Sequence, residues 1–111
     1  MQAGELSELR FPVHIISRKR LKEFWERHPD AKEPLDTWYR AAKRAKWQNL
    51  AETREMFPHA DPYGTCTIFN IGGNKYRLIT KIYYDDQTVL IRIVLTHPEY
   101  DRGRWKDDCN N

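Results

Sequence analysis

The chain has 111 residues, of which 40% are hydrophobic and 13% are aromatic, and its formal net charge is +3. This length suits one compact domain with a substantial core. No apolar stretch approaches the roughly 20 residues that a membrane-spanning helix needs, and the N-terminus lacks the apolar region of a signal peptide. Charged residues make up 32% of the chain, and the pI is near 8.9. This balance hints at an anionic partner.

The two cysteines do not form a recognisable framework. Cys66 lies in an expected strand, and Cys109 lies in the C-terminal tail. No Cys-x-x-Cys pair and no cluster of Cys and His has the spacing of metal ligands. We therefore expect reduced thiols, a cytoplasmic protein, and neither a metal site nor another cofactor.

The first part of the chain predicts an extension, a strand and a helix. Residues 1–12 are polar and end in a proline, so we expect them to form an extension outside the domain. The domain itself would span residues 13–111. Residues 13–17 are rich in β-branched side chains and predict a short strand. Ser17 is a suitable N-cap for a helix over residues 18–28, whose apolar side chains recur at helical spacing.

A second helix is predicted from about Asp30 to Trp47. Pro34 fits its first turn, where backbone N–H groups have no partner within the helix. Four basic residues crowd the polar side of this helix with no acid between them: Arg40, Lys43, Arg44 and Lys46. A basic run of this kind is more often a solvated face than a binding site.

After a short helical turn and a loop that ends at Gly64, the apolar period changes from 3.6 to 2. Residues 65–71, 75–84 and 89–96 then predict three strands, joined by the turns GGN and DDQT. The expected fold is α+β with the order β-α-α-β-β-β, a mostly antiparallel sheet, and two helices packed on one face.

One face of the predicted sheet gathers basic side chains because side chains alternate along a strand. If DDQT closes a loop of two or four residues, Lys81 lies opposite Arg92 and Arg77 lies opposite Thr96. Like charges directly opposite each other are destabilising, so an anion between Lys81 and Arg92 would stabilise the pair. A solvated face with the charges splayed into water explains the pattern equally well. The residues expected on this face are Asn70, Lys75, Arg77, Lys81, Arg92 and Thr96.

The stretch THPEYD, which follows the last strand, places acid–base side chains at the rim of this basic face. His97 is the natural acid–base group near neutral pH, and Tyr100 can donate a proton. Guanidinium and ammonium groups stabilise the extra charge of a pentacoordinate phosphorane. Together these groups suit RNA cleavage without a metal, in which the 2′-hydroxyl attacks the adjacent phosphate. The alternative is a hydrogen-bonded surface histidine at a strand end.

Three stretches in order resemble the HigB family of type II toxin–antitoxin toxins, the RelE-like mRNA interferases. They are HIISRKRLKEFWERHPDA from His14, FNIGGNKYRLI from Phe69, and RIVLTHPEYDR from Arg92. The resemblance extends from about His14 to Asp101. It implies a RelE-like fold, cleavage of mRNA on the ribosome, and neutralisation by a helix-turn-helix antitoxin of the HigA kind.

The resemblance also implies roles for individual residues. Lys75, Arg77 and Arg92 would bind or stabilise phosphate. His97 would be the acid–base group, with Tyr100 as its helper and Asp101 as an orienting partner. Asn70 and Lys81 complete the expected RNA-binding face. The sequence leaves open a non-catalytic RNA- or ribosome-binding module, and a protein-interaction module whose basic surface docks an acidic partner.

Deletion of residues 1–12 should leave the melting temperature and the activity unchanged. These residues offer little apolar surface to bury, so ordering them would cost more entropy than it recovers. Thermal unfolding of the full and the shortened chain tests this, and a large drop in melting temperature on deletion would contradict it.

Overall fold

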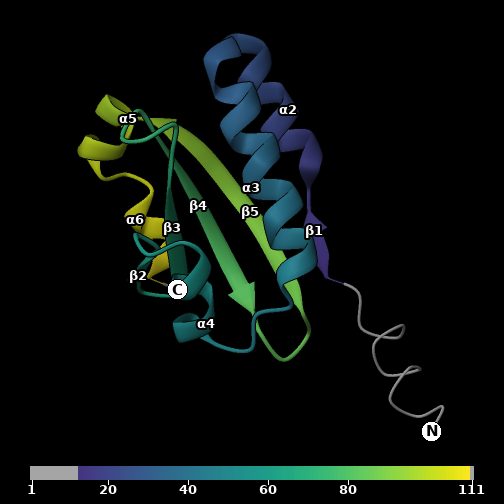
Figure 1. The fold of residues 1–111 in the computed structure, drawn as a ribbon. Coiled ribbons are helices and arrows are strands. Elements are labelled where there is room, and N and C mark those ends of the chain that lie inside the picture. The colour runs from purple at the N-terminus through teal and green to yellow at the C-terminus, as the bar shows by residue number, and fades with distance from the viewer. Residues whose placement is uncertain (1–12, 111) are drawn as a thin grey trace, which may run out of the picture.

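A five-stranded mixed sheet lies at the centre of the structure, and its strand order is β1-β5-β4-β3-β2 (Figure 1). The structure is a computed structural model that describes residues 13–110. Strand β1 pairs with β5 in parallel, and the other neighbouring strands pair antiparallel. The strands are β1 (His14–Ile16), β2 (Asp61–Tyr63), β3 (Cys66–Ile71), β4 (Tyr76–Tyr83) and β5 (Thr88–Thr96).

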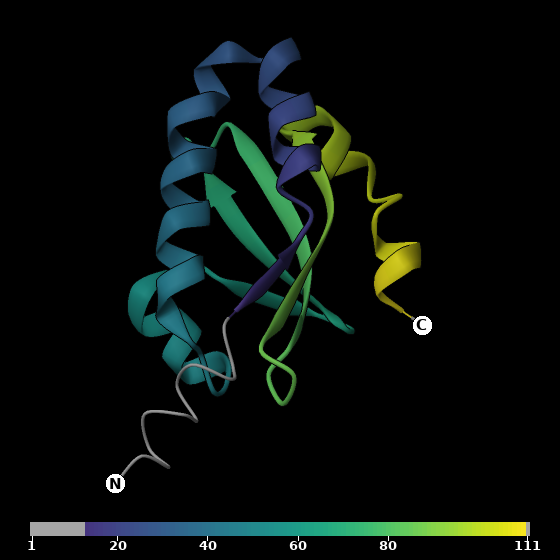
Figure 2. The same ribbon diagram turned by 90° about the vertical axis from the view of Figure 1, so that its right-hand side faces the viewer.

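Helices lie on both sides of this sheet (Figure 2). Helices α2 (Arg18–Arg27) and α3 (Lys32–Ala45) cover one face, and a 3₁₀ turn at Pro29–Ala31 joins them. None of the helices in the described residues is long and apolar enough to cross a membrane. The remaining helices are α4 (Leu50–Met56), α5 (His97–Arg102) and α6 (Lys106–Cys109).

The α+β prediction is confirmed, but the predicted order lacks three elements. Strand β2 lies in the predicted loop, and helices α5 and α6 have no counterpart in the prediction. Each is six residues or shorter, so none spans enough of the chain to show a clear apolar period. The predicted extension, residues 1–12, lies outside the described residues.

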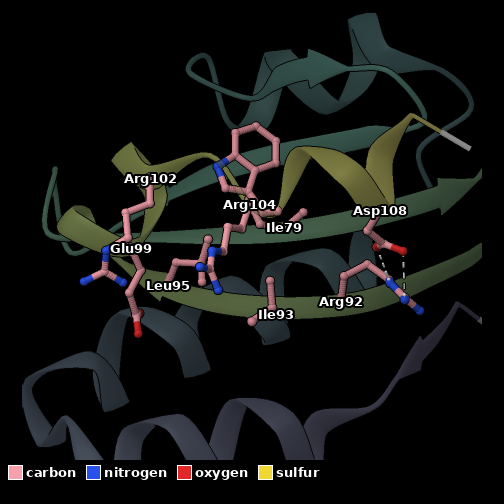
Figure 3. Close-up of a pocket in the computed structure, with 9 residues that line it drawn as sticks. Ile79, Arg92, Ile93, Leu95, Glu99, Arg102, Arg104 and Asp108 are labelled. Atoms are coloured by element: carbon pink, nitrogen blue, oxygen red, sulfur yellow. Dashed lines mark hydrogen bonds and ion pairs between the residues drawn. The ribbon is translucent and has the colours of Figure 1, made fainter.

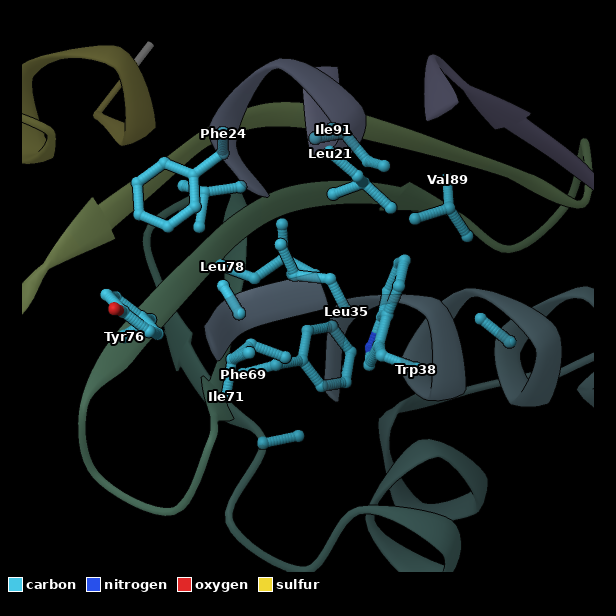
Figure 4. Packing of buried hydrophobic residues seen from close by; sticks show 14 of the residues in the cluster. Leu21, Phe24, Leu35, Trp38, Phe69, Ile71, Tyr76, Leu78, Val89 and Ile91 are labelled. Atoms are coloured by element: carbon cyan, nitrogen blue, oxygen red, sulfur yellow. The ribbon is translucent and has the colours of Figure 1, made fainter. Parts of the chain in front are cut away.

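The larger core lies between the sheet and the helices α2 and α3 (Figure 4). Helical spacing places Leu35, Trp38 and Ala42 on the buried side of α3. Thr80 is also fully buried on this face, and its hydroxyl donates to the Thr67 carbonyl at 2.8 Å. The apolar face predicted from the alternation of β4 is therefore the one that the helices cover.

The predicted pairing of β4 with β5 is wrong. Tyr83 pairs with Thr88, so the loop that connects the two strands spans residues 84–87. The register also shifts between Ile79 and Thr80, which pair with Ile93 and Ile91, so Arg92 has no pairing partner in β4. Such a bulge shifts the alternation of the strand by one residue. The observed partners are Lys81 with Leu90, Arg77 with Leu95 and Tyr76 with Thr96. Thr96 is therefore on the Tyr76 side of the sheet, whereas Asn70, which pairs with Arg77, lies on the Arg77 face as predicted.

The second face of the sheet is partly covered, contrary to the expectation of an open basic face. The residues after Gly103 fold back across it and bury a smaller apolar cluster of Cys66, Ile68, Ile79, Leu95, Trp105 and Cys109. The face is therefore a mixture of a buried patch and charged groups around it.

A disulfide joins Cys66 to Cys109, so the expectation of reduced thiols is wrong. The two cysteines are 43 residues apart in sequence, and their Cα atoms are 5.3 Å apart. The Cys109 carbonyl also accepts hydrogen bonds from the Thr65 backbone N–H at 2.8 Å and from its hydroxyl at 3.1 Å. The sequence conceals this pairing because the residues around Cys109 show no pattern of a regular element.

Gly64→Ala should destabilise the protein more than Gly73→Ala. Both glycines have positive φ, at +56° and +69°, so alanine costs about 1–2 kcal/mol at either position. At Gly64 alone, the new Cβ would lie 2.0 Å from the Cys109 carbonyl oxygen, while nothing lies within 4 Å at Gly73. We expect a further loss of ~1–3 kcal/mol at Gly64. Urea unfolding of both variants measures the difference, and equal losses would contradict the close packing.

Candidate functional site

The stretch THPEYD forms the start of helix α5 and not an extended rim. Thr96 is the N-cap, and its hydroxyl accepts the Glu99 N–H at 3.4 Å. The Glu99 carboxylate accepts the Thr96 N–H at 2.9 Å in return, which completes a capping box. This hydrogen bond lowers the pKa of Glu99. The cap fixes where the helix begins, and helical spacing then places His97, Tyr100 and Asp101 on one side of it.

His97 and Asp101 form a hydrogen-bonded pair on this side of α5. The distance from His97 Nδ1 to Asp101 Oδ2 is 3.0 Å, and both side chains are well exposed. The Tyr100 ring lies next to them, with its centroid 6.3 Å from that of His97. When Nδ1 donates to the carboxylate, Nε2 is left to exchange a proton with a substrate. The arrangement can therefore support acid–base chemistry.

Arg77 lies against the Tyr100 ring as well. Its guanidinium carbon is 4.9 Å from the centroid of that ring, and Tyr100 stacks on Trp105 with centroids 5.1 Å apart. The Asn74 side chain accepts from Arg77 Nη2 at 2.6 Å. Arg77 is only 9% exposed, so it is a rigidly placed cation next to the His97–Tyr100–Asp101 group. The structure thus brings these four predicted site residues together.

Lys81 and Arg92 meet at a carboxylate of the same chain. Arg92 binds Asp108 through two hydrogen bonds, Nε to Oδ2 at 2.6 Å and Nη2 to Oδ1 at 3.0 Å. The Lys81 ammonium is 3.8 Å from Asp108 Oδ1. The Arg92 hydrogen bond, helped by the charges of Arg92 and Lys81, lowers the pKa of Asp108. Lys81 and Arg92 are not opposite each other in the register, but an anion does lie between them.

Lys75 and Asn70 do not join this group. Lys75 forms an ion pair with Asp30 in the 3₁₀ turn, and the Tyr76 hydroxyl donates to the same carboxylate at 2.5 Å. These hydrogen bonds lower the pKa of Asp30 and raise the pKa values of Lys75 and Tyr76. Asn70 is exposed near the end of β3. Lys75 thus ties the turn before β4 to the helices.

A groove of about 440 Å³ runs between β5 and the C-terminal segment, residues 104–110 (Figure 3). Its apolar lining comes from Ile79, Ile93, Leu95 and Trp105. Arg102, the last residue of α5, and Arg104, two residues later, also line the groove. Neither arginine forms an ion pair with another described residue. Sequence reasoning missed both arginines, although they follow THPEYD closely and flank Gly103. The charged residues around the groove are Arg92, Glu99, Arg102, Arg104 and Asp108.

A metal site is not apparent in the described part of the chain. Among residues 13–110, no group of three or more His, Cys, Asp and Glu side chains is placed to hold a metal ion. At helix α5, the side chains that can move protons are those of His97 and Tyr100, and the Arg77 guanidinium beside Tyr100 can stabilise negative charge.

A family model for HigB toxins, described as the RelE-like toxic component of a toxin–antitoxin system, matches residues 31–103. The chain belongs to the HigB toxin family. This confirms the family resemblance, and the second and third of the three sequence stretches lie within the match. Within the HigB match lie helix α3, strands β2 to β5 and helix α5, and with them His97, Tyr100, Asp101 and Arg77. Residues 104–110, which carry Trp105, Asp108 and Cys109, lie beyond it.

Individual HigB proteins are also similar over most of the chain. The mRNA interferase toxin HigB of Escherichia coli K12 is 29% identical over 92 residues, which cover 80% of this chain and 88% of the relative. The mRNA interferase HigB of Escherichia coli O6:H1 is 27% identical over 93 residues, covering 81% and 90% respectively. A Shigella flexneri mRNA interferase HigB is 29% identical over 92 residues, again 80% of this chain and 88% of the relative.

The pKa of Asp108 should rise toward its ordinary value of 3.8 in an Arg92→Gln variant, because the largest cause of its lowering is the Arg92 hydrogen bond. A depressed pKa in the folded state means that the pair stabilises the protein above about pH 4 and that this stability is lost as the pH falls through the folded-state pKa. Carboxyl NMR titration measures the shift, with Asp30 as an internal control. An unchanged Asp108 titration would contradict the pairing.

Proposed function

We propose that this chain is the toxin of a type II toxin–antitoxin system and an endoribonuclease that cleaves mRNA. Membership in the HigB family supports the class, and the relatives named mRNA interferases support the substrate. The single observation that carries the catalytic assignment is the His97–Asp101 hydrogen bond beside Tyr100, with the Arg77 guanidinium against the Tyr100 ring. This combination places a proton carrier, its orienting carboxylate and a fixed cation next to one another at helix α5.

The reaction is a transesterification within the RNA. The 2′-oxygen loses its proton and attacks the adjacent phosphorus, and the bond from phosphorus to the 5′-oxygen breaks as that oxygen takes up a proton. His97 exchanges a proton through Nε2, while Asp101 keeps the ring oriented. Tyr100 donates to a phosphate oxygen or to the leaving oxygen. Arg77 stabilises the charge that develops on the phosphorane.

The proposed setting follows from the same family. The substrate is mRNA on the ribosome, in the cytoplasm, and the reaction uses no metal because side chains supply both proton transfer and charge stabilisation. The partner that silences the toxin is a helix-turn-helix antitoxin of the HigA kind. Asn70, Lys75, Lys81 and Arg92 are proposed as contacts to the RNA backbone away from the reacting phosphate. For Lys75 to make this contact, RNA has to compete with Asp30.

His97→Ala and Tyr100→Phe should relieve the growth arrest caused by expression of the chain without antitoxin. Loss of a general acid or base costs on the order of 10²–10⁴ in rate, and both side chains are partly exposed on α5, so the fold should survive. His59→Ala is a matched control because His59 is an exposed histidine outside the site. The readouts are growth, cleavage of cellular mRNA, and circular dichroism of each purified variant.

The same experiment separates catalysis from RNA binding alone. A non-catalytic RNA- or ribosome-binding module would arrest growth without cutting mRNA, and removal of His97 would leave that arrest intact. If folded His97→Ala, Tyr100→Phe and the double variant all remain as toxic as the parent chain, the catalytic assignment is wrong.

A further inference from the structure

Two cations beside the groove are neutralised by one carboxylate from the C-terminal segment, which is defined here as residues 104–110. Arg92 binds Asp108 through two hydrogen bonds (Figure 3). The Lys81 ammonium lies 3.8 Å from the same carboxylate. Two-point binding by a guanidinium is also how arginine holds a phosphate. The local balance is two positive charges against one negative charge. Asp108 thus occupies a site whose charge and geometry suit a phosphodiester.

The C-terminal segment is held beside the groove by contacts at its two ends. Near its start, the Trp105 ring stacks on Tyr100, and its indole N–H donates to the Tyr100 carbonyl at 3.0 Å. Near its end, Cys109 is bonded to Cys66, and its carbonyl accepts from Thr65. Helix α6 itself has only four residues, so these anchors decide where Asp108 lies.

The segment is an addition to the part of the chain that defines the family. The family model ends at residue 103, whereas Lys81 and Arg92 lie inside the matched range. The cations therefore belong to the toxin domain, and the carboxylate that covers them comes from outside it.

We propose that Lys81 and Arg92 form a binding subsite for an RNA phosphate, and that Asp108 masks this subsite until the C-terminal segment is released. The proposal rests on the proposed function, since the ligand is the RNA substrate. A phosphodiester has the single negative charge and the paired oxygens of the carboxylate that it replaces. Arg102 and Arg104, which line the same groove, contact the neighbouring phosphates once the RNA is seated.

The disulfide between Cys66 and Cys109 is the latch of this mask. A dithiol reductant opens it by thiol–disulfide exchange: the S–S bond takes up two electrons and two protons and becomes two thiols, and the dithiol is oxidised to its own disulfide. Because a reducing cytoplasm disfavours disulfides, the latch is open there under ordinary conditions and closes when the surroundings become oxidising. Reduction removes the covalent anchor of the segment and leaves its noncovalent contacts, so RNA competes with Asp108 for the two cations.

The test is the affinity of the full chain for a short 2′-O-methyl RNA, which cannot be cleaved because its 2′-oxygen is blocked. Asp108→Asn keeps the shape of the side chain and removes its charge. Asp86→Asn is the matched control, because Asp86 is an exposed carboxylate in the β4–β5 turn and its loss changes the net charge equally. Fluorescence anisotropy across a salt series gives the dissociation constants for both variants, and for the parent chain with and without a dithiol.

We expect Asp108→Asn to bind the 2′-O-methyl RNA about two- to fivefold more tightly than Asp86→Asn does. This is the size of effect expected when RNA no longer has to displace an exposed ion pair. Its salt dependence should steepen by about 0.7 for each additional phosphate that the protein neutralises. Reduction should tighten binding by the parent chain, and a Cys66→Ser/Cys109→Ser variant should bind tightly without reductant. Adding Arg92→Gln to Asp108→Asn should abolish the increase in affinity.

Two results would overturn the mask. Equal affinities of folded Asp108→Asn and Asp86→Asn would show that Asp108 does not compete with RNA. Weaker binding by Asp108→Asn would show that Asp108 positions Arg92 for the substrate. Failure of the proposed function looks different, because the parent chain would then leave mRNA uncut even with ribosomes present, while the affinities for 2′-O-methyl RNA still report on the mask.

Discussion

The packing of the C-terminal segment against strands β3 and β4 decides what the second face of the sheet can do. Without Trp105 and Cys109, the apolar side chains of Cys66, Ile68 and Ile79 would lie on an open face beside several cations. With them, the face is divided into a small buried cluster and a groove. Tyr100 connects this segment to the candidate site, since it stacks on Trp105 and also contacts Arg77. The geometry around His97 therefore depends on how firmly the segment is held.

Helix α5 is the second element on which the site depends. Its capping box begins the helix directly at the end of β5, so the last strand passes into the helix without a loop. His97 and Asp101 can meet only because they are about one helical turn apart. In an extended chain, the same side chains would be too far apart to share a hydrogen bond. The helix that follows Thr96 thus turns a strand end into a group with acid–base capacity.

The sequence predicts the large core well because its signal is long and regular. Leu35, Trp38 and Ala42 recur at helical spacing, and Leu78 and Thr80 alternate with Arg77 and Ile79 along β4. Periodicity of this kind can be recognised without any knowledge of tertiary structure. The position of Asn70 on the same sheet face as Arg77 is also predictable, because side chains alternate along the paired strands.

The errors have equally specific causes. The bulge near Arg92 has no signature in the sequence, and one extra residue is enough to move Thr96 to the opposite side of the sheet. The partner of Arg92 cannot be foreseen, because Asp108 reaches it only after the chain folds back. The same fold-back brings Cys109 to Cys66. Lys75 is predicted to bind phosphate, but in the structure it forms an ion pair with Asp30. The two residues are 45 positions apart in sequence, so no local pattern reveals this contact.

The most direct test of the proposed chemistry is the nature of the ends that the purified chain leaves on mRNA, with and without ribosomes and in the presence of a metal chelator. Mass spectrometry of the fragments distinguishes the products. Attack by the 2′-oxygen predicts a 2′,3′-cyclic phosphate on one fragment and a 5′-hydroxyl on the other, and wherever free mRNA is cut, its yield should be undiminished by the chelator. A 3′-hydroxyl with a 5′-phosphate, or loss of free-mRNA cleavage in the chelator, would contradict the role given to His97 and its neighbours.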